Sequence, residues 1–288
     1  MSLARSRQPG DRSHLERWLS EWAGAEGVTA GRLRRRVAVL VVSAMLDNQR
    51  DEEGRHRFVV KGGAALELRF GARARTSKDL DAVYRGVLDD AAGVVADAVA
   101  APWNGFTGRV TRLGRIDAPG PVVPPVRFEI KLAFKGKPFA TLPMEVSAPE
   151  GQALASVDAV AVSLEPVGLP APEFVSCLSV RYQVAQKLHA CTDQLDGVRP
   201  NDRAHDLADL ILLEELLAET DLADARSACV EIFTGRARQP WPPALVAPPH
   251  WARLWAALVD EERFPVEHLD EAVSRVRALI GNIEAARY

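Results

Sequence analysis

Hydrophobic side chains near the start of the chain recur with the spacing of amphipathic helices. In residues 13–48 they return every three or four positions, which predicts two helices. The second helix begins near Arg32 and is largely apolar. One face of the first helix carries these large side chains: Leu15, Trp18, Leu19 and Trp22. We therefore expect a helical N-terminal segment.

The pattern changes to that of strands between about residues 58 and 165. Residues 126–132 alternate strictly between apolar and polar side chains, as in a strand with one buried face. The sequence predicts antiparallel strands at 105–116, 126–134 and 139–147, and a helix from Asp89 to Ala100.

A group of prolines, Pro166, Pro170 and Pro172, separates this region from a helical one. We expect one domain over residues 1–165 and a helical lobe over residues 166–288. Within the lobe the predicted helical stretches are Val175 to Ala218, Leu222 to Phe233, Trp251 to Glu262 and Val266 to Ala285, with a proline-rich break at 240–249.

The segment around Gly62 and Gly63 is the first candidate for chemistry. A short β-rich run ends at Lys61, and residues 64–70 contain strong helix formers and stop at Gly71. The glycine pair therefore predicts a sharp turn from strand to helix that a ligand can approach closely. The free amides and the dipole of a helix N-terminus favour an anion such as a phosphate chain.

Two carboxylates follow this turn, at Asp79 and Asp81. Residues two apart in a strand project from the same face, so both side chains converge on one side. A divalent cation keeps two such carboxylates ionised, and oxygen ligands suit Mg²⁺ or Mn²⁺, with substrate phosphates completing the coordination. The alternative is a solvated Asp-x-Asp at a strand start, which the nearby glycine turn disfavours.

The turn, Ser77 and the Asp79-x-Asp81 pair resemble the first motif of the nucleotidyltransferase superfamily that includes DNA polymerase beta. The fuller string, residues 61–69 followed by residues 77–81, is similar to the AbiEii branch. That branch comprises toxins of abortive-infection toxin-antitoxin pairs and includes the mycobacterial MenT toxins. Gly-Gly in place of the usual Gly-Ser is the variant that this branch carries.

Later segments extend the resemblance, so that it spans roughly residues 58 to 215. Residues 139–147 resemble the strand that supplies a third carboxylate, here Glu145. Residues 182–190 resemble the helical lysine motif, here with Lys187. Residues 201–210 resemble the final Arg-x-x-Asp-Leu-x-Asp-Leu motif, in which Asp209 is the expected catalytic member and Asp206 the second.

Alternatives stay open at several of these positions. Glu129 competes with Glu145 for the third carboxylate, although its alternating strand indicates a solvated cross-strand partner. Lys187 is either a solvated helix lysine or a cation beside the core that neutralises triphosphate charge. One of Asp206 and Asp209 is expected to point into the cleft while the other supports it or caps Arg203.

A further set of residues near the carboxylates, several of them basic, are candidates for nucleotide binding. We assign this role to Lys61, Gly62, Gly63, Arg69, Ser77, Lys78, Lys187 and Asp206. A basic cluster of Arg69, Arg73, Arg75 and Lys78 flanks the site and could hold triphosphate or an RNA backbone. A second cluster of Arg32, Arg34, Arg35 and Arg36 has its side chains spread around a helix, as on a solvated face or at a partner contact.

Ser77 has two interpretations. Its hydroxyl can bond the local backbone and hold the turn before Asp79. Alternatively it is a regulatory phosphorylation site, where a phosphate would place about two negative charges beside the carboxylates.

Composition agrees with an enzyme that has a full core. The chain has 288 residues, 47% hydrophobic, with a net charge of −3, which excludes a generic binder of nucleic acid. Three separated cysteines suggest neither a disulfide framework nor a zinc site, and they are expected to be buried. The chain has no long apolar run and no signal-peptide core, so we expect a cytoplasmic protein without a membrane partner.

Together these features predict an α/β (α+β) fold, with a polymerase-beta-like nucleotidyltransferase core and a mixed sheet, N-terminal helices and a helical C-terminal lobe. The resemblance implies a Mg²⁺-dependent toxin that transfers nucleotides from an NTP to the 3′ end of tRNA and has a cognate antitoxin from the same operon. A small-molecule or protein nucleotidyltransferase is the first alternative. A non-catalytic nucleotide-binding module is the second.

Overall fold

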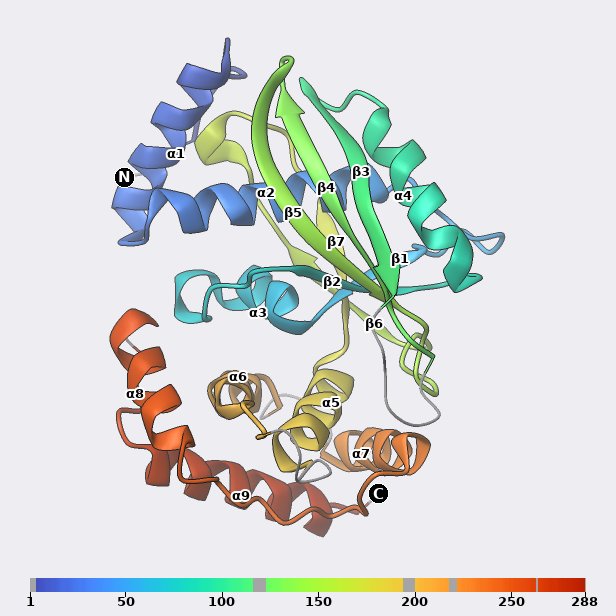
Figure 1. The fold of residues 1–288 in the computed structure, drawn as a ribbon, viewed down its shortest axis with the longest axis vertical. Helices are drawn as coiled ribbons and strands as arrows, with labels where there is room; N and C mark the ends of the chain where they lie inside the picture. Colours follow the sequence, from blue (N-terminus) through green and yellow to red (C-terminus); the bar gives the residue numbers. More distant parts are fainter. Residues whose placement is uncertain (1–3, 116–122, 194–199, 218–221, 263, 288) are drawn as a thin grey trace.

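A mixed sheet of seven strands forms the upper half of the molecule in Figure 1, in the order β3-β4-β5-β2-β1-β7-β6. The structure is a computed structural model that describes residues 4–115, 123–193, 200–217, 222–262 and 264–287. The strands are β1 (Phe58–Lys61), β2 (Leu80–Tyr84), β3 (Phe106–Arg115), β4 (Val126–Phe134), β5 (Lys137–Ser147), β6 (Val157–Ala161) and β7 (Phe174–Leu178). The predicted α/β class with a mixed sheet is confirmed.

Helices cover one face of the sheet and form a separate lobe below it (Figure 1). The α-helices are α1 (Arg12–Glu26), α2 (Ala30–Leu46), α3 (Gly62–Phe70), α4 (Ala91–Ala100), α5 (Val180–Thr192), α6 (Ala204–Leu217), α7 (Leu222–Arg236), α8 (Trp251–Glu262) and α9 (Leu269–Ala285). Short 3-10 turns are η1 (Gly71–Arg73), η2 (Leu88–Asp90) and η3 (Glu165–Val167). The predicted N-terminal helices and helical C-terminal lobe are both present.

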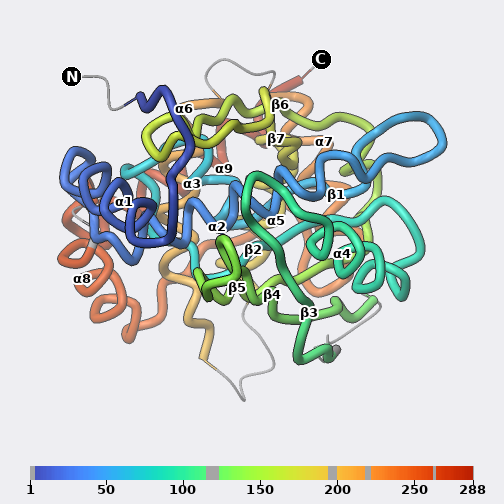
Figure 2. Tube along the Cα trace, turned by 90° about the horizontal axis from the view of Figure 1, so that it is seen from above, coloured from blue at the N-terminus to red at the C-terminus, as the bar shows by residue number. Residues whose placement is uncertain are grey.

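The first hydrophobic core lies between the sheet and the N-terminal helices. Helix α2 runs across the middle of the molecule, with α1 on one side and α4 on the other (Figure 2). Asp11 and Thr29 cap the N-termini of α1 and α2, and a left-handed Gly27 ends α1, which sets the sharp turn between them. The apolar stripe predicted for α1 is buried, because Leu15 and Leu19 are fully enclosed.

A second core fills the helical lobe and meets the opposite face of the inner strands. Val59, Val83 and Leu178 contribute to it from β1, β2 and β7. Helix α3 lies between the two cores, with Ala65 packed in the first and Leu66 in the second. The inner strands and α3 are therefore the structural link between the sheet and the helical lobe.

One stretch of the helical region was predicted wrongly. Residues 174–178 form β7, which pairs in parallel with β1 and antiparallel with β6, and the helices begin only at Val180. A short apolar run is compatible with either a strand or a buried helix, and the sheet decides between them. Strand β6 was not distinguished within the strand-rich region, and the predicted ends at residues 116 and 218 lie outside the described residues.

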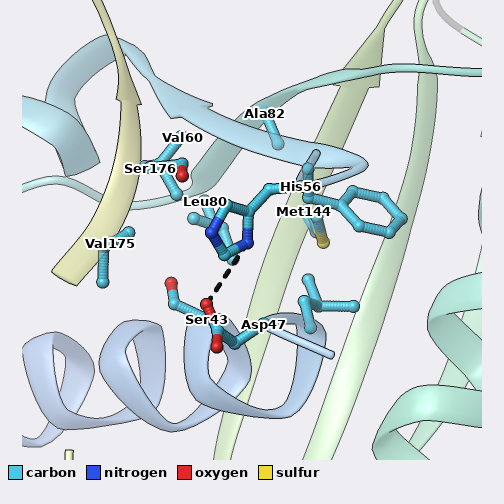
Figure 3. A pocket seen from close by; sticks show the side chains of 11 residues that line it. Ser43, Asp47, His56, Val60, Leu80, Ala82, Met144, Val175 and Ser176 are labelled. Carbon is cyan, nitrogen blue, oxygen red and sulfur yellow. Dashed lines mark ion pairs between the residues drawn. The ribbon is translucent and has the colours of Figure 1, made fainter. Parts of the chain in front are cut away.

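A cavity on the α2 side of the sheet is separate from the predicted site. Ser43, Asp47 and His56 line it together with inward-facing residues of the sheet, and the His56 ring lies 3.3 Å from the Asp47 carboxylate (Figure 3). Leu80 and Ala82 also line it. Since side chains alternate along a strand, Asp81 projects from the other face. The cavity therefore takes no part in the site described below.

Buried cysteines and the absence of a spanning helix also bear on the sequence predictions. Cys177, Cys191 and Cys229 are free and buried, as expected. Among the described helices, none is both long and apolar enough to cross a membrane.

Candidate active site

The turn between β1 and α3 places the backbone of two glycines against the carboxylate segment. Gly62 has a left-handed φ of +61°, and a Cβ there would collide with Oδ2 of Asp81. A Cβ at Gly63 would lie 3.1 Å from the Ser77 hydroxyl. Position 62 therefore requires glycine unless Asp81 moves, and no side chain caps the N-terminus of α3, which lies against Asp81.

We expect Gly62→Ala to damage both folding and the site. The left-handed conformation alone costs a non-glycine residue about 1–2 kcal/mol, and the added methyl group must also displace Asp81. The control is Gly93→Ala in α4, where a Cβ meets nothing within 4 Å and helix propensity should stabilise by about 0.5–1 kcal/mol. Thermal unfolding of both variants is the measurement, and equal unfolding temperatures would contradict the strain argument.

Three carboxylates lie side by side at the ends of β2 and β5. Strand β2 is parallel to β5, and the register puts Asp81 next to Glu145. Asp79 directly precedes β2 and accepts a hydrogen bond from Arg127 at 2.7 Å. Lys61 is opposite Asp81 on β1, and its ammonium donates to the Ser147 hydroxyl at 2.8 Å. The structure thus brings Glu145 beside the Asp79-x-Asp81 pair, from which it is far apart in the sequence.

The alternative third carboxylate, Glu129, lies away from this group. It is opposite Pro143 and Thr111, and its carboxylate accepts a hydrogen bond from the exposed Arg112 at 3.0 Å. By contrast, Glu145 is in register with Asp81. Geometry therefore favours Glu145 as the third carboxylate of the site.

The carboxylates are electrostatically strained in the free protein. Burial raises the pKa of Asp81, and the charge of Asp79 adds to this effect while Lys61 opposes it. Burial also raises the pKa of Glu145, and the charge of Asp81 adds to it. Excess negative charge at this point favours a bound cation.

The donor set fits a divalent cation that is shared with a substrate. Carboxylate oxygens are the ligands that Mg²⁺ and Mn²⁺ prefer, and Asp79 and Asp81 present them beside the open N-terminus of α3. Among the described residues, no three side chains of metal-ligating type converge closely enough to hold an ion alone. The arrangement suits a cation whose remaining ligands are phosphate oxygens.

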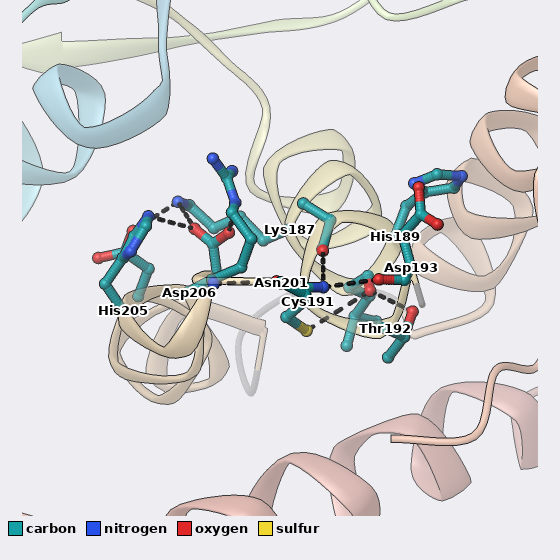
Figure 4. A network of polar contacts seen from close by, with 12 residues as sticks. Lys187, His189, Cys191, Thr192, Asp193, Asn201, His205 and Asp206 are labelled. Carbon is teal, nitrogen blue, oxygen red and sulfur yellow. Dashed lines mark hydrogen bonds and ion pairs between the residues drawn. The ribbon is translucent and has the colours of Figure 1, made fainter. Parts of the chain in front are cut away.

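Lys187 is buried at the interface of α5 and α6 and is paired with two aspartates. Its ammonium lies 3.0 Å from Oδ1 of Asp206 and 2.5 Å from Oδ2 of Asp209, and both aspartates are fully buried. Figure 4 shows Lys187 and Asp206 pointing toward each other from neighbouring helices. Burial lowers the pKa of Lys187, but the two aspartate charges outweigh it, so the pKa is raised. Lys187 is therefore a buried lysine paired with two carboxylates and not a solvated helix lysine.

Arg75, predicted only as one member of a basic cluster, links the carboxylate segment to the helical lobe. The Arg75 guanidinium donates to both carboxylate oxygens of Asp209, at 3.1–3.2 Å. The charges of Lys187 and Arg75 both act on Asp81, which places the lysine cluster within electrostatic reach of the carboxylates. Arg75 precedes Asp79 by four positions, so it ties the carboxylate segment to the helical lobe. Its spacing from the Asp79-x-Asp81 pair was the only signal in the sequence.

Asp206 has a different set of partners from Asp209. Besides Lys187, it accepts a hydrogen bond from Arg203 at 2.6 Å and lies 3.7 Å from the His205 ring. Burial raises the pKa of Asp206, but Lys187 and Arg203 outweigh it, so the pKa is lowered. Both aspartates therefore hold the lysine, and neither presents a free carboxylate to the cleft.

Several other basic residues serve the fold. The guanidinium of Arg69 donates to Asp158 at 2.8 Å and to the Leu178 carbonyl at 3.0 Å, so its contacts tie α3 to β6 and β7 and do not support the predicted nucleotide contact. Lys78 is exposed beside Asp79. In the N-terminal cluster, Arg32 pairs with Glu67, Arg34 with Glu16 and Arg36 with Glu26, which replaces the predicted solvated face with internal ion pairs.

Ser77 closes the turn that leads to Asp79. It is 4% exposed, and its hydroxyl donates to the carbonyl of Asp79 at 2.8 Å. Its amide donates to the carboxylate of the buried Glu67 at 3.3 Å. These contacts are those of a local cap, and a kinase could reach the hydroxyl only after this turn opens.

The family is decided by a sequence profile. Residues 45–275 match the profile described as nucleotidyl transferase AbiEii toxin, type IV toxin-antitoxin system. The chain belongs to the AbiEii nucleotidyltransferase family. The resemblance stated from the motifs is thereby confirmed, and the protein is a nucleotidyltransferase of a toxin family. A search of curated protein sequences gives no significant match.

One of the solved structures that resemble this AbiEii protein shares its fold. MenT4, a nucleotidyltransferase toxin from Mycobacterium tuberculosis H37Rv, aligns with a TM-score of 0.58 at 18% identity over 94% of this chain and 90% of its own. An antigenic nucleotidyltransferase-like protein from Paracoccidioides brasiliensis aligns with a TM-score of 0.41 at 14% identity, covering 71% and 89% of the two chains. The first likeness supports the nucleotidyltransferase fold, and the second is too distant to carry an argument.

Proposed function

We propose that this AbiEii protein transfers a nucleotide from an NTP to the 3′ end of tRNA, in a Mg²⁺-dependent reaction that blocks aminoacylation and translation. One observation carries the proposal. Asp81 and Glu145 are in register on adjacent strands and face the open Gly62-Gly63 turn, with the buried Lys187 within electrostatic reach. This arrangement supports attack on a phosphate.

The protein groups have separate tasks in the proposed reaction. The amides at the start of α3 hold the phosphate chain, and Lys187 offsets its negative charge. The acceptor hydroxyl oxygen bonds to the α-phosphorus as the bond to the β-phosphate bridge breaks, and pyrophosphate leaves. Glu145, whose pKa is raised by burial and by Asp81, takes the hydroxyl proton. Asp79 and Asp81 would hold a Mg²⁺ or Mn²⁺ ion, which would neutralise charge on the triphosphate.

Asp209 and Asp206 act as positioning residues in this proposal. Each is fully buried and accepts from Lys187, and Asp209 also accepts from Arg75. They hold the two cations in place, since a flexible lysine would lose that geometry. The catalytic assignment suggested for Asp209 by its motif is thus proposed here as an indirect one.

A cognate antitoxin is the proposed protein partner, because the family profile describes one half of a type IV toxin-antitoxin system.

Regulation at Ser77 is a further hypothesis. Mass spectrometry of the toxin co-expressed with its antitoxin should find a phosphorylated Ser77 peptide if the antitoxin acts there. An unmodified peptide would count against it.

Two other functions are tested by the same experiment. Purified protein and its Asp79→Ala variant are incubated with Mg²⁺, each labelled nucleoside triphosphate in turn, and total bacterial tRNA. The proposal expects label on tRNA only with intact Asp79. Pyrophosphate release without labelled RNA would favour a protein or small-molecule acceptor, and no turnover with any acceptor would favour a nucleotide-binding module.

A further inference from the structure

The three strands farthest from the helical lobe have one face that no described helix covers. Their apolar side chains, including Phe128, Ile130 and Leu142, point into the core on the side of α2 and α4. Figure 1 shows α2 behind these strands, so the other face of β3, β4 and β5 is open toward the viewer. The side chains on this open face alternate with the buried ones: Thr107, Arg109, Thr111, Arg127, Glu129, Lys131, Thr141 and Glu145.

The basic side chains on this open face, Arg109, Arg127 and Lys131, outnumber its carboxylates, Glu129 and Glu145, although the whole chain has a net charge of −3. Arg109 is opposite Lys131, and Lys131 is opposite Thr141, so they form one row across the three strands. In the described part of the chain, the side chains of Arg109 and Lys131 have no hydrogen-bond or ion-pair partner, although their backbones pair within the sheet. The negative charge of Glu129 is already paired with Arg112, which a register shift in β3 turns toward it.

The same face runs directly into the carboxylates. Arg127 is opposite Glu145, which is itself next to Asp81, and it contacts Asp79. Its side chain remains 49% exposed. Lys131 is four residues beyond Arg127 along β4, which places the two residues roughly 13 Å apart at 3.3 Å per residue. The phosphate backbone of a nucleic acid that lies along this face would therefore lead to the proposed reaction centre.

We propose that the open face of β3, β4 and β5 is the platform for the acceptor RNA strand, which lies over Arg109 and Lys131 and enters the site beside Arg127. The inference rests on the proposed function and adds the acceptor's path. Arginine, lysine and threonine hydroxyl groups are the usual partners of phosphate oxygens. Pro143, opposite Glu129, is a small apolar side chain within an otherwise polar row, well short of the apolar centre that a protein interface requires, so an RNA backbone is the occupant that this chemistry favours.

The test combines two charge reversals, Arg109→Glu and Lys131→Glu, with Arg253→Glu as the matched control. Arg253 is exposed on α8, in the other lobe. We measure initial rates of label transfer against tRNA concentration at several salt concentrations. The KM for tRNA should rise about tenfold or more in the double variant, and the salt slope of log affinity should fall by about one for each lost contact. The KM for the NTP and the unfolding temperature should stay at the control values.

A milder variant keeps the test valid if charge reversal disturbs the sheet. Arg109→Gln with Lys131→Gln removes the charges without adding negative ones, and its binding to tRNA can be measured by fluorescence anisotropy without turnover. A KM and a binding constant equal to those of the Arg253→Glu control would overturn the platform while leaving the proposed function intact. Failure of the unaltered protein to label RNA would instead reject the proposed function, and the platform with it.

Discussion

Replacing Asp81 with Asn is expected to reduce nucleotide transfer by about 10³-fold or more and, at the same time, to stabilise the metal-free protein. The loss of activity follows because Asp81 is the carboxylate that lies between the glycine turn and Glu145. The gain in stability follows because burial and the charge of Asp79 raise its pKa. The ionised side chain therefore costs more in the folded state than in the unfolded state, and Asn removes that charge.

The pH dependence of this stability difference has a definite sign. A carboxyl group whose pKa is raised by folding contributes stability below its unfolded pKa, and that contribution is lost as the pH rises through the folded pKa. The advantage of Asp81→Asn should therefore be absent in acid and reach about 0.5–2 kcal/mol near neutral pH. Denaturant unfolding of both proteins at several pH values measures it.

Metal provides the control for this prediction. Mg²⁺ with an NTP should stabilise the unaltered protein more than Asp81→Asn, because ligands that bind only the folded state raise its stability. A variant that is less stable than the unaltered protein at neutral pH without metal would show that Asp81 is not electrostatically strained. Activity retained in Asp81→Asn would remove it from the proposed reaction.

Replacing Lys187 with Met is expected to destabilise the protein by about 3–5 kcal/mol, the second large effect. The methionine side chain fills a similar volume, but Asp206 and Asp209 would lose the cation that they share inside the lobe. A buried charge without its partner is the costly state, whereas a neutral core of the same shape is tolerated. Chemical denaturation of the purified variant measures the difference.

A triple variant separates the structural role of Lys187 from its catalytic one. Lys187→Met with Asp206→Asn and Asp209→Asn removes the three buried charges together and leaves the partly exposed Arg75 and Arg203, so most of the lost stability should return. Nucleotide transfer should stay low, because the lysine that offsets the triphosphate charge in the proposed reaction is gone. Recovery of activity along with stability would show that the cluster only supports the fold.

Much of the fold could be predicted from local patterns. The strand at 126–134 was predicted with its observed bounds, because its alternation leaves one register in which all apolar side chains are buried. The bounds of the helix Trp251–Glu262 were also predicted correctly, from the proline-rich segment 240–249 that precedes it and from its apolar spacing. The prediction for residues 174–178 was wrong because the secondary structure of a short apolar run depends on its neighbours in space. Here β1 lies alongside it in parallel.

Some of the candidate site residues follow from local sequence, and others depend on contacts between distant segments. The sequence by itself determined the glycine turn and the Asp79-x-Asp81 pair, because both depend on neighbouring residues and on strand geometry alone. It could not determine which basic residues face a substrate: Arg69 and Arg75 belong to one cluster, yet Arg69 contacts Asp158 and Arg75 contacts Asp209. Only the tertiary structure brought Glu145 beside Asp81 and Lys187 between two aspartates, because those contacts join segments whose separation along the chain carries no information about their distance in space.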